Sequence, residues 1–321
     1  MGSDARTAQW LVQARGLRVD YDAVAAVVDL DLDIAAGQIY GLIGPNGAGK
    51  TSTLRALAGL LEPTYGEVRI GGFDLASEPE QAWRLLGFMP DFPPVYERLS
   101  VGDYLEVFAA AYEVPRTERT KRAKHWAERV GLDGKWGAAI GTLSRGMRHR
   151  LVLAKTLLPE PSVLILDEPA SGVDPIARAE MRDLLKEVAA RGGAVLVSSH
   201  ILPELSELCT AVGILEKGRL VVSGTLEEIR GRLGSPTRLE IRLADPAAIP
   251  RALEVVARHP AASEAAVEGG TRVSARFAAD DRAAAALLAG LVAAGLPVSD
   301  FRLERDSVED IFFRVGAREV S

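Results

Sequence analysis

The chain has 321 residues, of which 48% are hydrophobic and 26% charged, a balance that suits a soluble globular protein with one large domain and a smaller one. The formal net charge of −6 argues against a nucleic-acid-binding surface, which needs a clustered positive field. The single cysteine, Cys209, excludes an internal disulfide framework and a zinc site built on several thiolates, and it fits a reducing, cytosolic compartment. Because Cys209 lies in an apolar segment, we expect it to be a buried thiol.

Neither a secretory signal nor a membrane span is visible in the sequence. The first residues, 1–4, are polar and acidic, without a basic region followed by an apolar one. The longest stretch without polar side chains, 283–298, has 16 residues, whereas a membrane helix needs about 20. We interpret this stretch as a core helix that leads into a strand, and we expect any membrane contact to come through a partner.

Taken in chain order, the first predicted elements are strands. Residues 10–34 alternate between apolar and polar side chains, which predicts antiparallel strands leaning on a main sheet. Residues 38–43 form an apolar run, and the glycine-rich segment 44–51 follows it. Residues 51–60 are then expected to form a helix, and residues 67–70 another strand.

The middle of the chain combines helices with buried strands. Ser100 and Asp103 have the spacing of a capping box at the start of a helix. The segment 115–130 is dense in Arg, Lys and Glu, and because both signs are interspersed it indicates a solvated helix face rather than a nucleic-acid patch. Residues 163–166 and 194–198 are unalternating apolar runs, typical of strands buried on both faces of a parallel sheet.

A composition shift at 231–236 indicates the start of a second domain. The elements expected beyond it are a strand at 239–243, a helix at 252–257, a hairpin around Gly269-Gly270, a helix at 283–294 and a strand at 298–303. This βαββαβ order suggests a small ferredoxin-like α+β domain.

The glycine-rich segment 44–51 matches the pattern G-x-x-x-x-G-K-[ST] of a phosphate-binding loop. Its glycines let backbone N–H groups turn toward phosphate oxygens, and the N-terminus of the following helix adds partial positive charge. Lys50 is placed to reach the β- and γ-phosphates of ATP, and the Thr51 hydroxyl is placed to bind Mg²⁺. The residues expected to hold ATP here are Gly44, Asn46, Gly47, Gly49, Lys50, Thr51 and Ser52.

Two carboxylates follow the apolar run at 163–166. Asp167 ends this run, where it is expected to hold Mg²⁺ through a water. Glu168 is the candidate to orient and deprotonate the attacking water. A carboxylate pair after a strand is by itself no more than a helix cap or a loop, but the phosphate-binding loop favours the catalytic interpretation and a P-loop ATPase.

The segment 143–147, Leu-Ser-Arg-Gly-Met, lies between the phosphate-binding loop and Asp167. With these motifs the chain resembles the ATP-binding subunit of an ABC transporter over roughly residues 17–315. In that family the motif begins a helix and caps the γ-phosphate of ATP held by the opposite subunit, which implies this role for Ser144 and Gly146. A hydroxyl, a glycine N–H and a helix dipole together make an anion site.

The same resemblance implies roles for three further residues. Tyr21 matches the aromatic residue that stacks on adenine, and the alternative is a surface tyrosine in a strand. His200 matches the switch histidine that contacts the γ-phosphate, and we count it with Glu168 as catalytic. Asp174 matches the loop that communicates between the two sites across the dimer.

The sequence departs from the common family pattern at three positions. Arg145 stands where the first signature glycine usually is, and Met147 stands where glutamine usually is. We expect a working site with altered ribose contacts, in which Arg145 either adds a charge to the cleft or points to solvent. Asp91 occupies the place of the glutamine that senses Mg²⁺, and because aspartate is one methylene shorter we expect it to reach Mg²⁺ through a water.

The variants Met-Pro-Asp at 89–91 and Leu-Ser-x-Gly-Met resemble the type-2 ABC exporter class, whose members pump drugs, lipids or polysaccharides. Segments 298–303 and 307–312 also resemble the tail of that class. The fold implied is an α/β P-loop NTPase core with an antiparallel β subdomain and an inserted helical subdomain, plus a small α+β C-terminal domain. We place the ATP-binding domain at 10–232, with its helical subdomain at about 92–155, and the accessory domain at 237–316.

This resemblance implies an ATP-hydrolysing subunit that forms a homodimer through ATP, with Mg²⁺ as cofactor, and powers a membrane exporter. Its partner is then a membrane-spanning permease subunit, and its place is cytoplasmic, peripheral at the inner face of the cell membrane. The transported cargo and nucleic acid are not expected to bind this chain. The apolar segment 92–96 is predicted either to form part of a groove for a short helix of the permease or to pack under the helical subdomain.

Two alternatives have weaker support. A non-transport ABC ATPase that acts on nucleic acid or ribosomes is disfavoured, because the chain has one phosphate-binding loop and no heptad run between its motifs. A binding module that only senses ATP is disfavoured because Glu168 and His200 are present.

Overall fold

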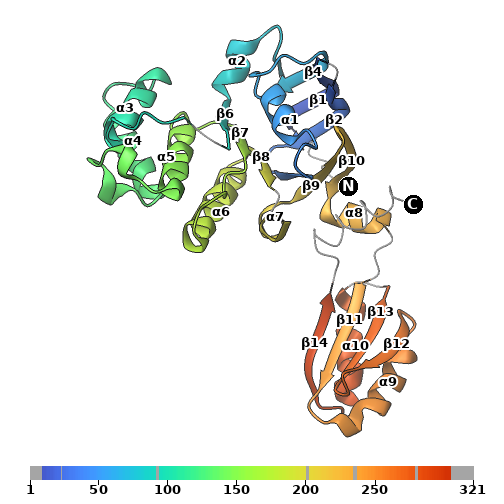
Figure 1. Cartoon of the computed structure of the whole chain (residues 1–321). Helices are drawn as coiled ribbons and strands as arrows, with labels where there is room; N and C mark the ends of the chain where they lie inside the picture. Colours follow the sequence, from blue (N-terminus) through green and yellow to red (C-terminus); the bar gives the residue numbers. More distant parts are fainter. Residues whose placement is uncertain are drawn as a thin grey trace, which may run out of the picture. The chain divides into compact units, whose positions relative to one another are not determined.

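The structure is a computed structural model, and it describes residues 9–22, 24–91, 94–199, 202–233, 237–278 and 281–304. The chain forms two compact units, Met1–Leu226 and Glu227–Ser321 (Figure 1). Each unit has a sheet and an apolar core of its own.

A six-stranded sheet forms the centre of the first unit, with the strand order β10-β9-β3-β8-β7-β6. Its strands are β3 (Ile39–Ile43), β6 (Leu86–Met89), β7 (Val163–Asp167), β8 (Ala194–Ser199), β9 (Ala211–Glu216) and β10 (Arg219–Thr225). All neighbours are parallel except β9 and β10. Every residue of β3, β7 and β8 is buried, which confirms the prediction made from their unalternating apolar runs.

An antiparallel sheet of order β2-β1-β4-β5 accompanies the central sheet. It contains β1 (Trp10–Tyr21), β2 (Val24–Ala35), β4 (Tyr65–Ile70) and β5 (Phe73–Asp74). Helix α1 (Lys50–Leu57) contacts strands of both sheets, and one apolar core joins them to it. The helix stops short of the expected Leu60, because the Leu60 N–H turns back to the Arg55 carbonyl at 2.9 Å, as in a helix C-cap.

Three helices that contact one another form the helical subdomain: α3 (Val101–Ala111), α4 (Arg119–Arg129) and α5 (Arg145–Leu157). The N-cap half of the predicted capping box is confirmed at α3, where the Asp103 N–H donates to Ser100 Oγ at 3.0 Å. The Asp103 carboxylate accepts from the Ser100 hydroxyl at 2.6 Å, a bond between the two side chains. The remaining helices of the first unit are α2 (Pro79–Arg84), α6 (Pro175–Ala190) and α7 (Leu202–Leu208).

The second unit begins with α8 (Leu226–Leu233) and continues with the predicted βαββαβ order. The elements are β11 (Thr237–Leu243), α9 (Ile249–Ala257), β12 (Ala262–Glu268), β13 (Arg272–Phe277), α10 (Asp281–Ala293) and β14 (Val298–Glu304). The strands are antiparallel in the order β12-β13-β11-β14. Apolar residues of the sheet pack on α9 and α10, with Leu239, Ile241 and Phe277 buried among them.

The expectation that Cys209 is a buried thiol is confirmed, and burial raises the pKa of this thiol to about 12. None of the helices in the described part of the chain is both long and apolar enough to cross a membrane.

Candidate nucleotide site

Ten of the residues expected at the nucleotide site line a single cavity of about 380 Å³. The cavity lies where β3 and β7 end, because parallel strands bring their carboxyl ends to the same edge of a sheet. Its lining consists of Tyr21, Ala26, Pro45, Asn46, Gly47, Gly49, Lys50, Thr51, Ser52, Asp91, Asp167 and Glu168.

The loop between β3 and α1 is shaped to hold an anion. Gly49 has φ 104°, and a Cβ at this position would lie 2.2 Å from the Ala26 carbonyl oxygen, so only glycine fits. Lys50 is buried, and its Nζ donates to the carbonyl oxygens of Gly44 at 2.7 Å and Pro45 at 3.3 Å. The N-terminus of α1 and this ammonium group therefore meet at one concave loop, the arrangement that binds phosphates.

The charge of Lys50 is balanced by the acids across the cavity. Burial lowers the pKa of Lys50, and the negative charges of Glu168 and Asp167 oppose this effect. The carboxylates that face the loop therefore favour the ammonium form of the lysine.

Asp167 and Glu168 are joined by a hydroxyl that the sequence analysis did not single out. Asp167 is buried, and its Oδ2 accepts from Thr51 Oγ1 at 2.9 Å. The Ser198 hydroxyl, 0% exposed, donates to Asp167 Oδ1 at 2.6 Å and accepts from the Glu168 N–H at 3.0 Å. In the sequence, the only sign of Ser198 is that it is a polar residue at the end of an apolar run. Its position opposite Asp167 on the neighbouring strand comes from the pairing of β7 with β8.

The backbone of Glu168 adopts an uncommon conformation, with φ 48°. A non-glycine residue in this left-handed region is strained, and such strain concentrates at functional sites. The conformation is held by the Ser198 bond and by the Ser171 N–H, which donates to the Glu168 carbonyl oxygen at 3.1 Å. The buried imidazole of His149 also hydrogen-bonds to the backbone of Pro169, and burial lowers its pKa.

The donor atoms in the cavity fit a magnesium ion. The Thr51 hydroxyl and the Asp167 carboxylate already lie within hydrogen-bond distance of each other, and the Asp91 carboxylate lines the same cavity. All three supply oxygen, the ligand type that Mg²⁺ prefers.

Ser144 and Gly146 do not line this cavity but lie at the start of α5. Ser144 is the N-cap of the helix, and its exposed Oγ accepts from the Met147 N–H at 3.3 Å. An N-terminus with an exposed serine and several backbone N–H groups offers an anion site to another molecule.

Arg145 and Gly146 contact the loop that precedes α6. The Arg145 guanidinium donates to Ser171 Oγ at 3.2 Å, and a Cβ at Gly172 would meet Arg145 Cδ at 3.2 Å. A Cβ at Gly146 would lie 3.1 Å from the Gly172 carbonyl oxygen. The Arg145 side chain therefore lies along the Ser171–Gly172 backbone instead of extending freely into solvent.

Asp174, Tyr21 and His200 complete the expected set. Asp174 is the N-cap of α6, and the Ala177 N–H that donates to it at 3.0 Å lowers the pKa of its carboxyl. Tyr21 is 45% exposed where β1 ends, and Ser52 Oγ donates to its hydroxyl at 3.4 Å. His200, Phe92, Pro93 and the tail segment 307–312 lie outside the described residues.

Comparison with known proteins agrees with this geometry. The family model described as ABC transporter matches residues 27–171. The chain is 31% identical to the daunorubicin resistance ATP-binding protein DrrA2 of Streptomyces coeruleorubidus over 95% of each chain. It is 34% identical to the Nod factor export ATP-binding protein I of Burkholderia orbicola, over 77% of this chain and 82% of that one.

Solved structures of ABC ATP-binding proteins are also similar to this chain. The structure of an ATP-binding subunit of an ABC transporter superposes with a TM-score of 0.66 and 32% identity, covering 70% of this chain and 93% of that one. A dimeric ATP-binding cassette bound to ADP and Pi shares the fold, with a TM-score of 0.63 at 21% identity over 67% of this chain and 98% of that one.

The chain therefore belongs to the ABC transporter family. Within that family it is an ATP-hydrolysing nucleotide-binding subunit that powers a membrane exporter, and the predicted resemblance to the type-2 exporter class is confirmed.

Proposed function

We propose that the cavity binds ATP with Mg²⁺ and that Glu168 is the general base of its hydrolysis. The observation that carries this proposal is the Ser198 hydroxyl, which joins Glu168 to the Thr51–Asp167 pair beside the phosphate-binding loop. Lys50 and the loop N–H groups bind phosphate oxygens, and Thr51 and Asp167 hold the metal, with Asp91 acting through a water. Bound Mg²⁺ neutralises negative charge on the phosphates. The Glu168 carboxylate orients the attacking water and takes its proton.

We also propose that the site is completed by a second copy of the chain. Ser144 and Gly146 lie outside the cavity that the other motifs line, so a head-to-tail partner is needed to bring them to the γ-phosphate. Tyr21 stacks on adenine, His200 contacts the γ-phosphate, and Asp174 transmits the state of one site to the other. Loss of the γ-phosphate removes the bridge between the copies, and the dimer opens.

The variant Glu168→Gln tests both proposals. It keeps the shape of the side chain but removes the base, so we expect turnover to fall by about 100-fold or more while ATP still binds. With ATP this variant should sediment as a dimer. Glu67→Gln, at an exposed position of β4, is the matched control and should hydrolyse ATP like the unmodified chain. Hydrolysis that survives Glu168→Gln contradicts the assignment of the base, and a variant that stays monomeric with ATP contradicts the shared site.

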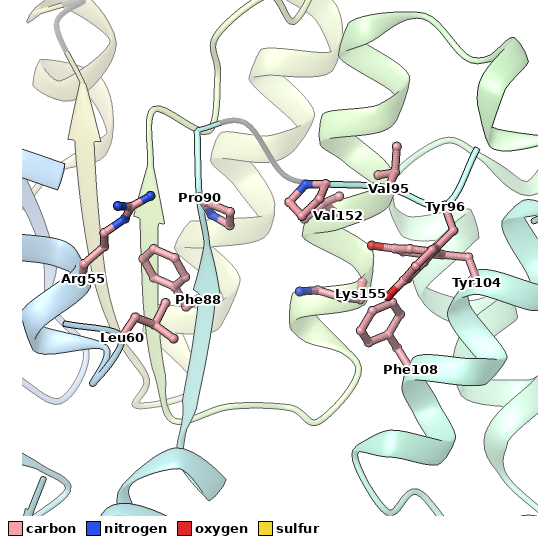
Figure 2. Close-up of a pocket in the computed structure, with 11 residues that line it drawn as sticks. Arg55, Leu60, Phe88, Pro90, Val95, Tyr96, Tyr104, Phe108, Val152 and Lys155 are labelled. Atoms are coloured by element: carbon pink, nitrogen blue, oxygen red, sulfur yellow. The ribbon is translucent and has the colours of Figure 1, made fainter. Parts of the chain in front are cut away.

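A second surface of the first unit fits a protein partner. A groove of about 550 Å³ lies between α1 and β6 on one side and α3 and α5 on the other (Figure 2). Of the segment 92–96, the described residues Pro94, Val95 and Tyr96 line it, and Tyr96 is 64% exposed. The full lining is Arg55, Leu60, Phe88, Pro90, Pro94, Val95, Tyr96, Tyr104, Phe108, Val152 and Lys155.

We propose that this groove receives a short amphipathic helix of the permease, which places the subunit at the cytoplasmic, inner face of the cell membrane. The only charged residues of the lining are Arg55 and Lys155, and within the described part of the chain neither has a carboxylate partner. Lys155 Nζ lies 5.3 Å from the centre of the Phe108 ring, and burial lowers the pKa of this lysine. An occupant with an apolar face and a carboxylate would satisfy both features. Neither cargo nor nucleic acid is expected to bind this chain.

The variant Tyr96→Asp tests the groove. A carboxylate in place of this exposed ring should weaken docking of an apolar helix and abolish export, while ATP binding by the isolated subunit is retained. Tyr65→Asp is a matched control, because Tyr65 is 68% exposed on β4 and does not line the groove. Full export by Tyr96→Asp would contradict the proposal.

A further inference from the structure

The sheet of the second unit has one covered and one open face. Residues at alternate positions, such as Leu239 and Ile241, are buried against α9 and α10. The positions between them point to the other face, where charged side chains gather on neighbouring strands. These residues are Arg238, Glu240 and Arg242 in β11, Arg272 and Arg276 in β13, and Asp300, Arg302 and Glu304 in β14.

Three arginines of this open face are paired with acids. Arg238 Nη2 lies 2.6 Å from Glu268, and Arg276 Nε lies 2.8 Å from Glu264. Arg302 Nε lies 2.9 Å from Asp300. Ion pairs of this kind are what an ordinary solvated sheet face shows.

Arg242 and Arg272 are different. They are directly opposite each other in the antiparallel register of β11 and β13, where two like charges are unfavourable, as Arg238 and Arg276 also are, but each of those two is paired with an acid. Among the residues that the structure describes, no carboxylate forms an ion pair with either of them. The acids that flank them in register are engaged elsewhere, since Asp300 is bound by Arg302, and Glu268 is bound by Arg238 and by Ser274 Oγ at 3.0 Å.

A cavity of about 110 Å³ opens at this arginine pair. Its lining is Glu240, Ile241, Arg242, Arg272, Asp300 and Arg302. Since a water molecule takes about 30 Å³ of liquid, the cavity has room for one tetrahedral oxyanion rather than for a whole nucleotide. The acids in the lining are neutralised, because Glu240 lies 3.3 Å from Arg238 Nε and Asp300 is bound by Arg302.

We propose that this cavity binds one phosphate group, that of a phosphate ester or the terminal one of a pyrophosphate, between Arg242 and Arg272. Two guanidinium groups can bind the oxygens of one phosphate through charge-assisted hydrogen bonds, and an anion between them relieves the repulsion of two like charges that lie directly opposite each other. The site lies entirely within the second unit and does not depend on the nucleotide site. Its ligand is either a soluble phosphorylated molecule or the headgroup of an acidic phospholipid.

The test is a titration of the ¹⁵N-labelled full-length chain with sodium pyrophosphate, read from the amide resonances of β11 and β13. Residue-specific signals separate this binding from binding at the phosphate-binding loop. We expect saturable shifts in the unmodified chain, and at least tenfold weaker binding in the double variant Arg242→Gln, Arg272→Gln. Arg276→Gln, on the same face but paired with Glu264, is the matched control and should bind like the unmodified chain.

A second measurement distinguishes a soluble phosphorylated ligand from a phospholipid headgroup. The same proteins are sedimented with phosphatidylcholine vesicles, with and without phosphatidic acid. Binding to the acidic vesicles that the double variant loses assigns a lipid headgroup, whereas pyrophosphate binding without vesicle binding assigns a soluble ligand. The proposal is overturned if neither probe binds, or if the double variant binds equally well.

Discussion

Ser198 is a buried hydroxyl that serves two neighbours, the Asp167 carboxylate and the Glu168 N–H. In Ser198→Ala, one buried N–H loses its partner and one carboxylate loses a donor, at a cost of about 1.5–3 kcal/mol for a bond to a charged group. If this free energy is lost from the positioning of Glu168 in the transition state, turnover decreases by about tenfold or more. ATP affinity should change little, because Lys50 and its loop are untouched.

The conservative variant Ser198→Thr keeps the hydroxyl and is expected to restore most of the turnover. The measurement is kcat for hydrolysis beside the Kd for ATP, since a general loss of folding would lower binding as well. A Ser198→Ala enzyme with unmodified kcat would show that this hydroxyl does not position the acids.

The contrast between Lys50 and Ser198 shows which site residues a sequence can predict. Lys50, Thr51 and Asp167 belong to local motifs, in which the spacing along the chain fixes the chemistry. The role of Ser198 arises only when β7 and β8 pair and place it opposite Asp167. His149 belongs to none of the motifs, and nothing in the sequence of its helix indicates the Pro169 backbone that it contacts.

At the scale of elements, unalternating apolar runs predicted three buried strands of the central sheet, whereas the short edge strand β6 was not predicted. The runs that became β3, β7 and β8 consist of consecutive apolar residues, and their burial on both faces follows. Strand β6 has four residues that include a glycine and lies at the edge of the sheet, so its sequence has no long apolar run that would predict a strand. A groove was one of two alternatives for the apolar segment 92–96, and the other walls of the observed groove come from elements distant in sequence.

Helix α5 and the loop before α6 are held together by a close backbone contact at Gly146. Adding a methyl group in Gly146→Ala places a Cβ 3.1 Å from the Gly172 carbonyl oxygen, so the loop must move. Overpacking of this kind costs about 1–3 kcal/mol, and it displaces Ser144 relative to Asp174. We expect hydrolysis to fall by about tenfold with little change in ATP affinity.

Gly137→Ala is the matched control for this change, because a Cβ at Gly137 would meet no atom within 4 Å. Hydrolysis rates and nucleotide affinities of both variants are compared with those of the unmodified chain. Equal rates for Gly146→Ala and Gly137→Ala would show that the α5 contact tolerates displacement.

At the scale of the whole molecule, the composition shift at 231–236 predicted two domains, and each unit has its own apolar core. The homodimer came from family resemblance alone. A single chain carries both halves of the proposed shared site, but its own fold keeps Ser144 out of the cavity that Lys50 lines, so no pattern within the sequence reveals the pairing.

Because the two units have separate apolar cores, we expect two thermal unfolding transitions. Only the transition of the first unit, which contains the nucleotide site, should shift when nucleotide binds. ATP with Mg²⁺ at 100 times its Kd stabilises the unit that binds it by about 2.7 kcal/mol. For a unit of this size each kcal/mol raises the unfolding temperature by about 2–4 °C, so the shift should be about 5–10 °C. Differential scanning calorimetry of Glu168→Gln, which does not consume the ligand, measures it, and Lys50→Ala should abolish the shift. Because the second core contains no part of the nucleotide site, its transition should stay in place, and an equal shift of both transitions would show that the two units unfold together.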